Sequence, residues 1–333
     1  MDILGITCLR DEGPWLLDWI AHHRALGFTH FLIASHDLSD GSDALLDALD
    51  AAGVVTHVPF QPKGGKSVQW QAMKLLSDLA AYKEADLALF FDVDEYLVLD
   101  EGTLAELVPD SADAVALRWH LFGHAGLSCW QDTPVTERFT HAAPDDIALP
   151  LAHFFKSLHR PTAFDGLGVH RPKGRDGRWI AANGTPMPPA FCAAQARINL
   201  FGLPHQGERA WLNHYSVRSI EEFVLKTQRG LPNHMEKPVG LGYWAERNFN
   251  TCPDTRIARH ADAARAARQD LRAFDPLHMA CLQHHRVRLD ALMQEKPVVD
   301  LMWQLTLLAG STPPDAPALK GHLARLTALA KDA

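Results

Sequence analysis

The sequence predicts an α/β protein in which helices cover both faces of a mostly parallel sheet, followed by a helical extension at the C-terminus. Three observations lead to this fold class. Strand-like and helix-like segments alternate over residues 3–91, a pattern typical of parallel sheets with right-handed crossovers. Polar residues gather where the predicted strands end. Beyond about residue 255 the composition becomes rich in Ala, Arg and Leu, with helical spacing.

The alternation starts with an apolar strand near the N-terminus. The first helix begins near Pro14, which suits a first helical position, and ends at Gly27. Its apolar residues recur every three or four positions, so one side of the helix is expected to be buried. The predicted strands are 3–8, 29–35, 54–58 and 86–91, and the predicted helices are 14–27, 40–52 and 66–81.

Composition limits the class of protein. The chain has 333 residues, 47% hydrophobic residues and a net charge of −8. An acidic chain lacks the clustered cations that nucleic acids require, so we expect no nucleic-acid partner. No apolar run of 18 residues is present, so no membrane span is expected. Five scattered cysteines and no basic leader lead us to expect a reduced, cytoplasmic protein.

The segment Asp92-Val93-Asp94-Glu95 follows the apolar run 87–91 directly. In an extended chain Asp92 and Asp94 would share one face, with Cα atoms about 7 Å apart. When two carboxylates lie this close together, each raises the pKa of the other unless a cation lies between them. Oxygen ligands at the end of a parallel strand suit Mg²⁺ or Mn²⁺. The alternative, for an isolated pair of this kind, is a solvated turn.

Two further polar clusters favour the metal interpretation. Residues 10–12 follow the first predicted strand and residues 35–40 follow the second. The carboxyl ends of parallel strands meet at one edge of a sheet, where ligands bind. His214 lies in a short apolar strand between Asn213 and Tyr215, which suits a positioned ligand. An imidazole added to two carboxylates shifts the preference toward Mn²⁺.

Two other features have weaker functional interpretations. Residues 64–67 stand between a strand and a helix as a phosphate loop would, but Phe60 occupies the position that needs a glycine. Lys66 remains a candidate phosphate contact at a helix N-terminus. A basic stripe on the helix predicted at 256–272 could contact a membrane surface or an acidic acceptor, or could simply be solvated.

Taken together, these segments resemble glycosyltransferases of the GT-A (Rossmann-like) fold, specifically the bacterial family 2 branch related to family 92. Each segment is short, but they run in order from residue 6 to about 250. The segments that carry the resemblance are 7–12, 19–27, 35–42, 66–72, 92–96, 119–123, 169–173 and 213–215, with Ser219, Phe223, Lys226 and Arg229.

The resemblance implies a domain at 1–250 and a helical extension at 251–333. Residues 1–115 would bind a nucleotide-diphosphate sugar, with a UDP-sugar as the first choice, and residues 116–250 would bind a glycan or other hydroxyl acceptor. The metal, Mn²⁺ or Mg²⁺, would be held by Asp92, Asp94 and His214. The residues expected to hold the donor are Arg10, Glu12, Asp37, Asp40, Lys66, Gln69 and Asp92. His36 stands where the family usually has Asn, which leaves the nucleobase open.

The implied reaction is a metal-dependent sugar transfer, inverting by analogy with the family. An acceptor hydroxyl needs a carboxylate or imidazole base within hydrogen-bond reach. Asp165, Glu137 and His170, in that order, are the candidates in the acceptor half. Two alternatives stay open: a nucleotidyltransferase on the same scaffold and a non-catalytic glycan-binding module. A nucleotidyltransferase would need a Gly- and Arg-rich loop after the first strand, which residues 9–14 lack.

Overall fold

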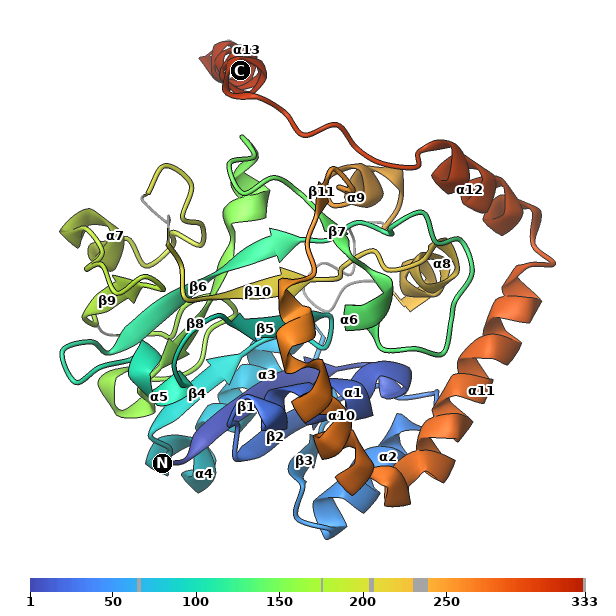
Figure 1. Cartoon of the computed structure of the whole chain (residues 1–333), viewed down its shortest axis with the longest axis horizontal. Helices are drawn as coiled ribbons and strands as arrows, with labels where there is room; N and C mark the ends of the chain where they lie inside the picture. The colour runs from blue at the N-terminus through green and yellow to red at the C-terminus, as the bar shows by residue number, and fades with distance from the viewer. Residues whose placement is uncertain (65–66, 175, 204–206, 230–238, 332–333) are drawn as a thin grey trace.

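The computed structural model describes residues 1–64, 67–174, 176–203, 207–229 and 239–331 (Figure 1). Within these residues, nine strands form one sheet in the order β3-β2-β1-β4-β8-β6-β10-β5, and β9 pairs with β6. The sheet is mixed but mainly parallel, and helices cover both of its faces. The predicted α/β class and the C-terminal helical region are confirmed.

The first half of the sheet is the parallel part that the alternation predicted. β1 lies between β2 and β4, and β3 extends the sheet beyond β2. Leu9 at the end of β1 is in register with Ser35 at the end of β2. The carboxyl ends therefore meet at one edge, as expected. The bounds are β1 Ile3–Leu9, β2 His30–Ser35, β3 Val55–Pro59 and β4 Leu87–Phe90.

The second half of the sheet reverses direction. β8 lies antiparallel between β4 and β6, which the sequence did not predict. β10 and β9 run parallel to β6, and β5 pairs antiparallel with β10. The bounds are β5 Glu95–Leu99, β6 Ala114–Leu121, β8 Phe155–His159, β9 Trp179–Ala181 and β10 Ala210–His214, and a separate ladder joins β7 His141–Ala142 to β11 Cys252–Pro253.

Among the described residues, two main apolar cores lie on the two faces of the sheet, and a third, smallest cluster surrounds Phe155, Trp179 and Phe191. The larger core contains side chains of α1, α2, α8 and α11 together with one face of the strands. Trp19 of α1 lies at its centre, fully buried, and donates its indole N–H to the carbonyl of Glu95 at 3.1 Å. The smaller core packs α3 and α4 on the opposite face. The bounds are α1 Gly13–Ala25, α2 Ser42–Ala51, α3 Val68–Ser77, α4 Ala80–Glu84 and α8 Ile220–Arg229.

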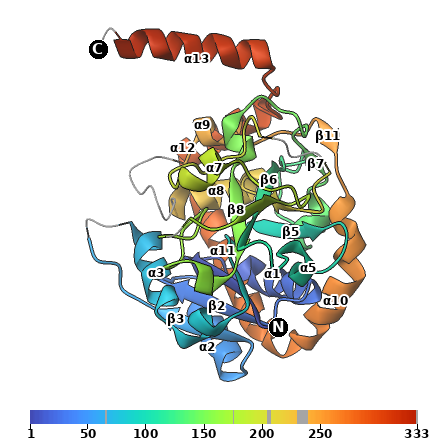
Figure 2. The ribbon, with the colours of Figure 1, turned by 90° about the vertical axis from the view of Figure 1, so that its left-hand side faces the viewer.

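The C-terminal region is helical but is not separate from the core along its whole length. α10 and α11 pack against α1, and Cys281 and Leu282 of α11 belong to the larger core. By contrast, α13 projects away from the body of the molecule (Figures 1 and 2). The bounds are α10 Ala261–Asp270, α11 Asp275–Leu292, α12 Lys296–Leu307 and α13 Ala316–Lys331. Among the described helices, none combines the length and the apolar character needed to cross a bilayer.

Short helical segments connect the larger elements. The α-helical ones are α5 Leu104–Leu107, α6 Val135–Arg138, α7 Pro189–Ala193 and α9 Leu241–Ala245, and the 3₁₀ turns are η1 Pro150–His153, η2 Pro161–Ala163, η3 Arg256–His260 and η4 Arg272–Phe274.

Two local predictions are wrong. Residues 92–94 do not continue the strand in extended form; they form the turn between β4 and β5, in which the amide of Glu95 donates to the carbonyl of Asp92 at 3.0 Å. The helix predicted at 256–272 is divided into η3, α10 and η4. Four of its five arginines, all except Arg272, pair with carboxylates of the chain: Arg256 with Asp254, Arg259 with Asp100, Arg265 with Glu137 and Asp262, and Arg268 with Asp18 and Asp275.

Candidate functional site

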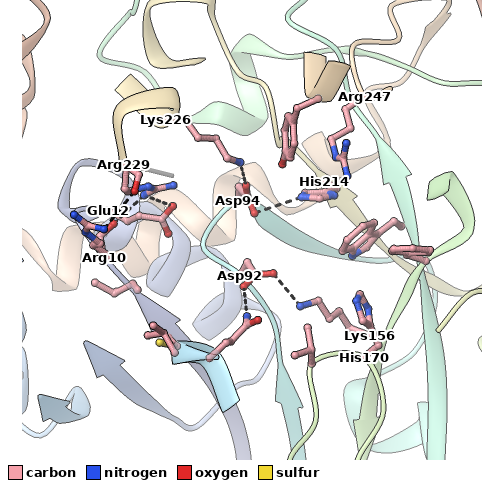
Figure 3. Close-up of a pocket in the computed structure, with 18 of the residues that line it drawn as sticks. Arg10, Glu12, Asp92, Asp94, Lys156, His170, His214, Lys226, Arg229 and Arg247 are labelled. Carbon is pink, nitrogen blue, oxygen red and sulfur yellow. Dashed lines mark hydrogen bonds and ion pairs between the residues drawn. The ribbon is translucent and has the colours of Figure 1, made fainter. Parts of the chain in front are cut away.

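A cleft with a volume of about 240 Å³ opens at the carboxyl ends of β1, β2 and β4 (Figure 3). The second half of the sheet closes its other side through β6, β8 and β10. Carboxylates and cations face each other across it. The charged lining residues are Glu12, Asp92, Asp94, Arg10, Lys156, Lys226, Arg229 and Arg247, and the others are Cys8, Leu9, His36, Val68, Gln69, Trp119, Phe154, Val169, His170, His214 and Tyr243.

Asp92 lies at the floor of the cleft, and two side chains donate to it. Lys156 Nζ contacts Oδ2 at 2.9 Å, and Gln69 Nε2 contacts Oδ1 at 3.2 Å. The backbone amide of Asp92 donates to Glu95 Oε2 at 3.0 Å, which holds the turn. The side chain of Asp92 keeps 33% of its surface exposed. It can therefore be reached by a ligand from the cleft.

Lys156 is a fully buried cation between two carboxylates. Its Nζ lies 3.5 Å from Oε1 of Glu95, which is also fully buried. Burial and the charges of Asp92 and Asp94 raise the pKa of Glu95 well above its usual range, although Lys156 opposes this. Burial disfavours charge on Lys156, but Asp92 and Glu95 raise its pKa. Lys156 therefore stays protonated and directs its charge at Asp92.

Asp94 lies on the opposite side of the turn and is paired with a second lysine. Lys226 Nζ donates to Oδ2 at 2.8 Å and to the carbonyl of Ser216 at 2.8 Å. His214 Nε2 lies 3.5 Å from Oδ1 of Asp94. Burial alone would raise the pKa of Asp94, but Lys226 and His214 hold it well below its ordinary value. Asp94 is therefore charged at neutral pH.

A third ion pair closes the wall of the cleft beside β1. Arg229, near the end of α8, contacts Oε1 of Glu12 at 2.6 Å and donates to the carbonyl of Arg10 at 3.0 Å. In turn, Arg10 Nη1 donates to the carbonyl of Arg229 at 3.3 Å. These contacts join the β1–α1 loop to α8.

Aromatic side chains line the side of the cleft that β6 and the segment 243–247 form. Trp119 of β6 packs against His214, with ring centroids 4.2 Å apart, and against Phe154. The guanidinium of Arg247 stacks on the ring of Tyr243, 3.9 Å from its centroid. Flat aromatic faces beside fixed charges suit a sugar ring, which presents apolar C–H faces and polar hydroxyl edges.

The structure brings together seven of the residues proposed from the sequence: Arg10, Glu12, Gln69, Asp92, Asp94, His170 and His214 all line the cleft. Lys66 lies outside the described residues. Asp37 and Asp40 do not line the cleft, and their expected role in holding the donor stays a prediction. Asp37 is half-exposed and accepts from its neighbour His36 at 3.0 Å. Asp40 is buried and accepts from Gly13 N at 3.1 Å and His285 Nε2 at 3.0 Å, so it joins α1, α2 and α11 instead.

Glu137 and Asp165, two of the three candidate bases, also lie away from the cleft. Glu137 is exposed on α6 and pairs with Arg265 of α10 at 3.0 Å. Asp165 is exposed, and its amide donates to the carbonyl of Lys173 in a loop. His170 alone of the three lines the cleft. Its Nδ1 lies 2.8 Å from the carbonyl of Phe155, so in the tautomer with hydrogen on Nδ1 the Nε2 lone pair is left to face outward.

Sequence reasoning missed Lys156, Lys226, Arg229 and Arg247 as site residues. One signal could have revealed Lys156: it interrupts the apolar run from Phe154 to Leu158. A lysine inside a buried strand is rare unless it is paired. Nothing in the local sequence indicates which carboxylate it meets.

The residues fit a divalent cation only in part. Within the described ranges, no group of three or more His, Cys, Asp or Glu side chains is arranged to hold a metal. His214 lies 3.5 Å from Asp94, and its role as a third ligand stays a prediction. Mg²⁺, however, commonly binds through one or two carboxylates plus substrate phosphates. Asp92 and Asp94 match that simpler donor set, although each is paired with a lysine.

Comparison with known proteins gives one family match. The model of glycosyltransferase family 92 matches residues 6–183, which is more than half of the chain. The matching model is that of family 92, and the expected assignment to family 2 is not confirmed. No curated protein sequence matches the chain significantly.

Solved structures show weaker likenesses. TarS 1–349 of S. aureus in complex with UDP has 11% identity and a TM-score of 0.32, over 49% of this chain and 48% of that chain. The chain thus spans about half the length of that structure. A putative glucose-1-phosphate thymidylyltransferase from Bacillus anthracis has 12% identity and a TM-score of 0.29, over 48% and 72%. These likenesses are too low to decide between functions.

Proposed function

Because the chain belongs to glycosyltransferase family 92, we propose that it transfers a sugar from a nucleotide-diphosphate sugar to a hydroxyl group of a glycan or other acceptor. One observation supports the proposal above the others. The carboxylates Asp92 and Asp94 share an open cleft with five cationic side chains at the carboxyl edge of the sheet. Such a cleft can accept a diphosphate together with its counter-charges.

The chemical requirement is stabilisation of the departing diphosphate. Its negative charge grows as the bond to the sugar breaks, and fixed cations in a poorly hydrated cleft stabilise that charge strongly. Lys226, Arg229 and Arg247 line the cleft and can supply this stabilisation. We propose that Asp92 and Asp94 also hold Mn²⁺ or Mg²⁺ when the donor binds, where the ion would supply a Lewis acid to the diphosphate.

His170 is the proposed base for the acceptor hydroxyl. Burial and the charge of Lys156 lower the pKa of His170 to about 3. It is therefore uncharged at neutral pH, and its Nε2 lone pair can accept a hydrogen bond from the acceptor hydroxyl. Because a group of such low pKa is a weak base, the role requires that the negative charge of the bound donor raise the pKa of His170. We propose an inverting, single displacement, which the anomeric configuration of the product, observed by NMR, would test.

Because Glu137 and Asp165 are exposed, substitutions at these residues are expected to have little effect on the rate of sugar transfer. Glu137→Gln and Asp165→Asn are expected to change kcat by less than about threefold, since neither side chain lines the cleft and so neither can reach the acceptor hydroxyl. Steady-state kinetics of sugar transfer measure this, and His170→Gln is the matched change inside the cleft. A loss of a hundredfold or more in Asp165→Asn would restore that residue as the base.

The direct test of function is a donor screen. The protein is incubated with a panel of nucleotide sugars and Mn²⁺ or Mg²⁺, and release of nucleoside diphosphate is measured. Turnover of at least one donor is expected. A parallel assay with sugar 1-phosphates and nucleoside triphosphates would detect the pyrophosphate that a nucleotidyltransferase releases. Binding of a glycan without turnover of any donor would favour a non-catalytic module.

The pairing of Asp94 with Lys226 predicts competition between the lysine and the metal. In Lys226→Met, the Kd of the nucleotide-free protein for Mn²⁺ is expected to fall at least about tenfold, because a unit charge about 4 Å away opposes the ion by several kcal/mol at the effective dielectric of a protein surface. Calorimetric titration measures this, with the exposed Lys74→Met as control. Unchanged or weaker Mn²⁺ binding would argue that Asp94 does not hold the ion.

We further propose that the protein works in a reducing compartment such as the cytoplasm. All five cysteines are free thiols, and Cys8 and Cys281 are buried. Peripheral contact with a membrane also stays a proposal, less favoured now that the arginines of residues 256–268 are paired within the chain.

A further inference from the structure

A second, smaller pocket adjoins the cleft. Arg10, Lys226 and Arg229 line both spaces, so they form the wall between them. On its far side the second pocket is lined by Arg218 and by His285 and Arg288 of α11. Its volume is about 60 Å³, roughly four to six times the 10–15 Å³ that one water molecule needs. This is room for one small charged group and too little for a sugar ring.

Arg218 is the residue that marks this pocket as a binding site. It is 6% exposed, and its Nε and Nη2 atoms are buried without a hydrogen-bond partner in the described part of the chain. Its guanidinium stacks on Trp15, 3.9 Å from the ring centroid. Its backbone φ is +54°, a conformation that residues other than glycine rarely adopt and that often marks functional sites. A buried cation whose donors have no acceptor is costly to maintain.

The carboxylates of the same pocket give Nε and Nη2 of Arg218 no hydrogen bond, although the charge of Arg218 acts on Glu222. Both oxygens of Glu222 are taken: Arg138 contacts them at 2.6 and 2.9 Å, and Trp15 and Ser219 also donate to them. Asp11 accepts from the amide and the hydroxyl of Ser39.

The other cations of the pocket divide into paired and unpaired groups. Lys226 is paired with Asp94, and Arg229 is paired with Glu12. Among the described residues, Arg218 and Arg288 form no ion pair, and the hydroxyl of Ser216 is buried without a partner. The pocket therefore has an excess of positive charge and unused hydrogen-bond donors. These features suit an anion and would repel a cation.

We propose that this pocket binds a single phosphate or carboxylate group carried by the acceptor. An arginine fork matches the oxygen geometry of both groups, and such charge-assisted hydrogen bonds are among the strongest in proteins. The shared wall would hold the acidic group beside the donor cleft, so that the rest of the acceptor extends toward the sugar. The assignment to an acceptor rests on the proposed sugar transfer, whereas the anion site itself does not.

The anion site is tested first, with inorganic phosphate as the probe. Calorimetric titration is performed with UDP present, so that phosphate does not enter the donor cleft. Wild-type protein is expected to bind phosphate, and Arg218→Gln and Arg288→Gln are each expected to weaken binding at least tenfold. Arg286→Gln, on the same helix but outside the pocket, is the control. Equal phosphate binding by the wild type and both variants, or none by the wild type, would overturn the proposal.

The two pockets are separated by a reciprocal substitution. Arg247 lines only the cleft and Arg288 lines only the second pocket. Arg247→Gln is expected to weaken UDP binding and leave phosphate binding unchanged, and Arg288→Gln is expected to do the reverse. Because Arg288 is exposed, this variant will fold even if Arg218→Gln, which loses its packing on Trp15, does not.

The source of the anion is then distinguished with acceptors. Sugar acceptors that carry a phosphate or a carboxylate are compared with their uncharged parents in the transfer assay. The acidic acceptors are expected to have a KM at least tenfold lower, and Arg288→Gln should remove that preference without changing kcat. Phosphate binding without any preference for acidic acceptors would overturn the assignment to the acceptor and indicate a site for free anions. Failure of sugar transfer itself would leave the phosphate result unaffected.

Discussion

Asp94→Asn is expected to lower the turnover of sugar transfer by at least about a hundredfold, because the divalent cation that Asp94 is proposed to hold would supply several kcal/mol of charge stabilisation. The substitution keeps the size of the side chain and removes its charge. Asp94 then loses its ion pair with Lys226, at 2.8 Å, and its capacity to bind a divalent cation. Steady-state kinetics across Mn²⁺ concentrations measure the loss.

A loss of turnover in Asp94→Asn has to be distinguished from a loss of folding. Lys226 keeps its hydrogen bond to the carbonyl of Ser216 in the variant but loses its partly buried partner, so thermal unfolding is expected at a lower temperature. Circular dichroism at the assay temperature checks that the variant is folded when turnover is measured. Asp43→Asn, an exposed position on α2, is the control for loss of one negative charge. Turnover within threefold of the wild type would contradict the placement of Asp94 at the reacting centre.

Glu222→Gln is expected to cost about 3–5 kcal/mol in the free energy of unfolding, the typical result of breaking a buried ion pair by removal of one partner. The two oxygens of Glu222 accept a bidentate contact from Arg138, and Trp15 donates to the same carboxylate at 3.0 Å. This carboxylate joins α8, α6 and α1. Without its charge, Arg138, which is 8% exposed, stays buried and unpaired. Such a loss is a large part of a typical total of 5–15 kcal/mol.

Urea denaturation of Glu222→Gln should show a lower midpoint than the wild type. The exposed Glu84→Gln on α4 is the matched control and should leave the midpoint unchanged. A shift equal to that of the control would mean that the bidentate pair contributes no stability.

The same pair gives a pH dependence of defined sign. Burial would raise the pKa of Glu222, but Arg138, Arg218 and Ser219 lower it below its ordinary value. A carboxyl group whose pKa is lower in the folded state stabilises the fold above its unfolded pKa, near 4.3, and that stabilisation is lost as the pH falls through the folded value. The stability difference between the wild type and Glu222→Gln is therefore expected to be largest at neutral pH and to shrink below about pH 4. Urea titrations at several pH values measure it.

The first half of the fold was predictable because its signals are local. The spacing of apolar residues and the capping residues identify strands and helices within short stretches of sequence. Strands that alternate with helices imply a parallel sheet. The convergence of residues 10–12 and Asp92 at one edge follows from that topology. The extended conformation expected for residues 92–94 was wrong, since the turn depends on β5 pairing with the distant β10.

By itself, the sequence determined the parallel α/β half, the position of the acidic pair at the end of β4 and the helical C-terminal region. Only the tertiary structure decided which cations meet those carboxylates. β8 enters the sheet antiparallel beside β4 and brings Lys156 to Asp92 across 64 residues, while α8 brings Lys226 to Asp94 across 132. The tertiary structure also buries Asp40, whose hydrogen bonds from Gly13 and His285 join α2 to α1 and α11. Contacts between residues so far apart in the sequence depend on the order of the strands and on how the helices pack. The spacing of hydrophobic residues along the chain determines neither of these.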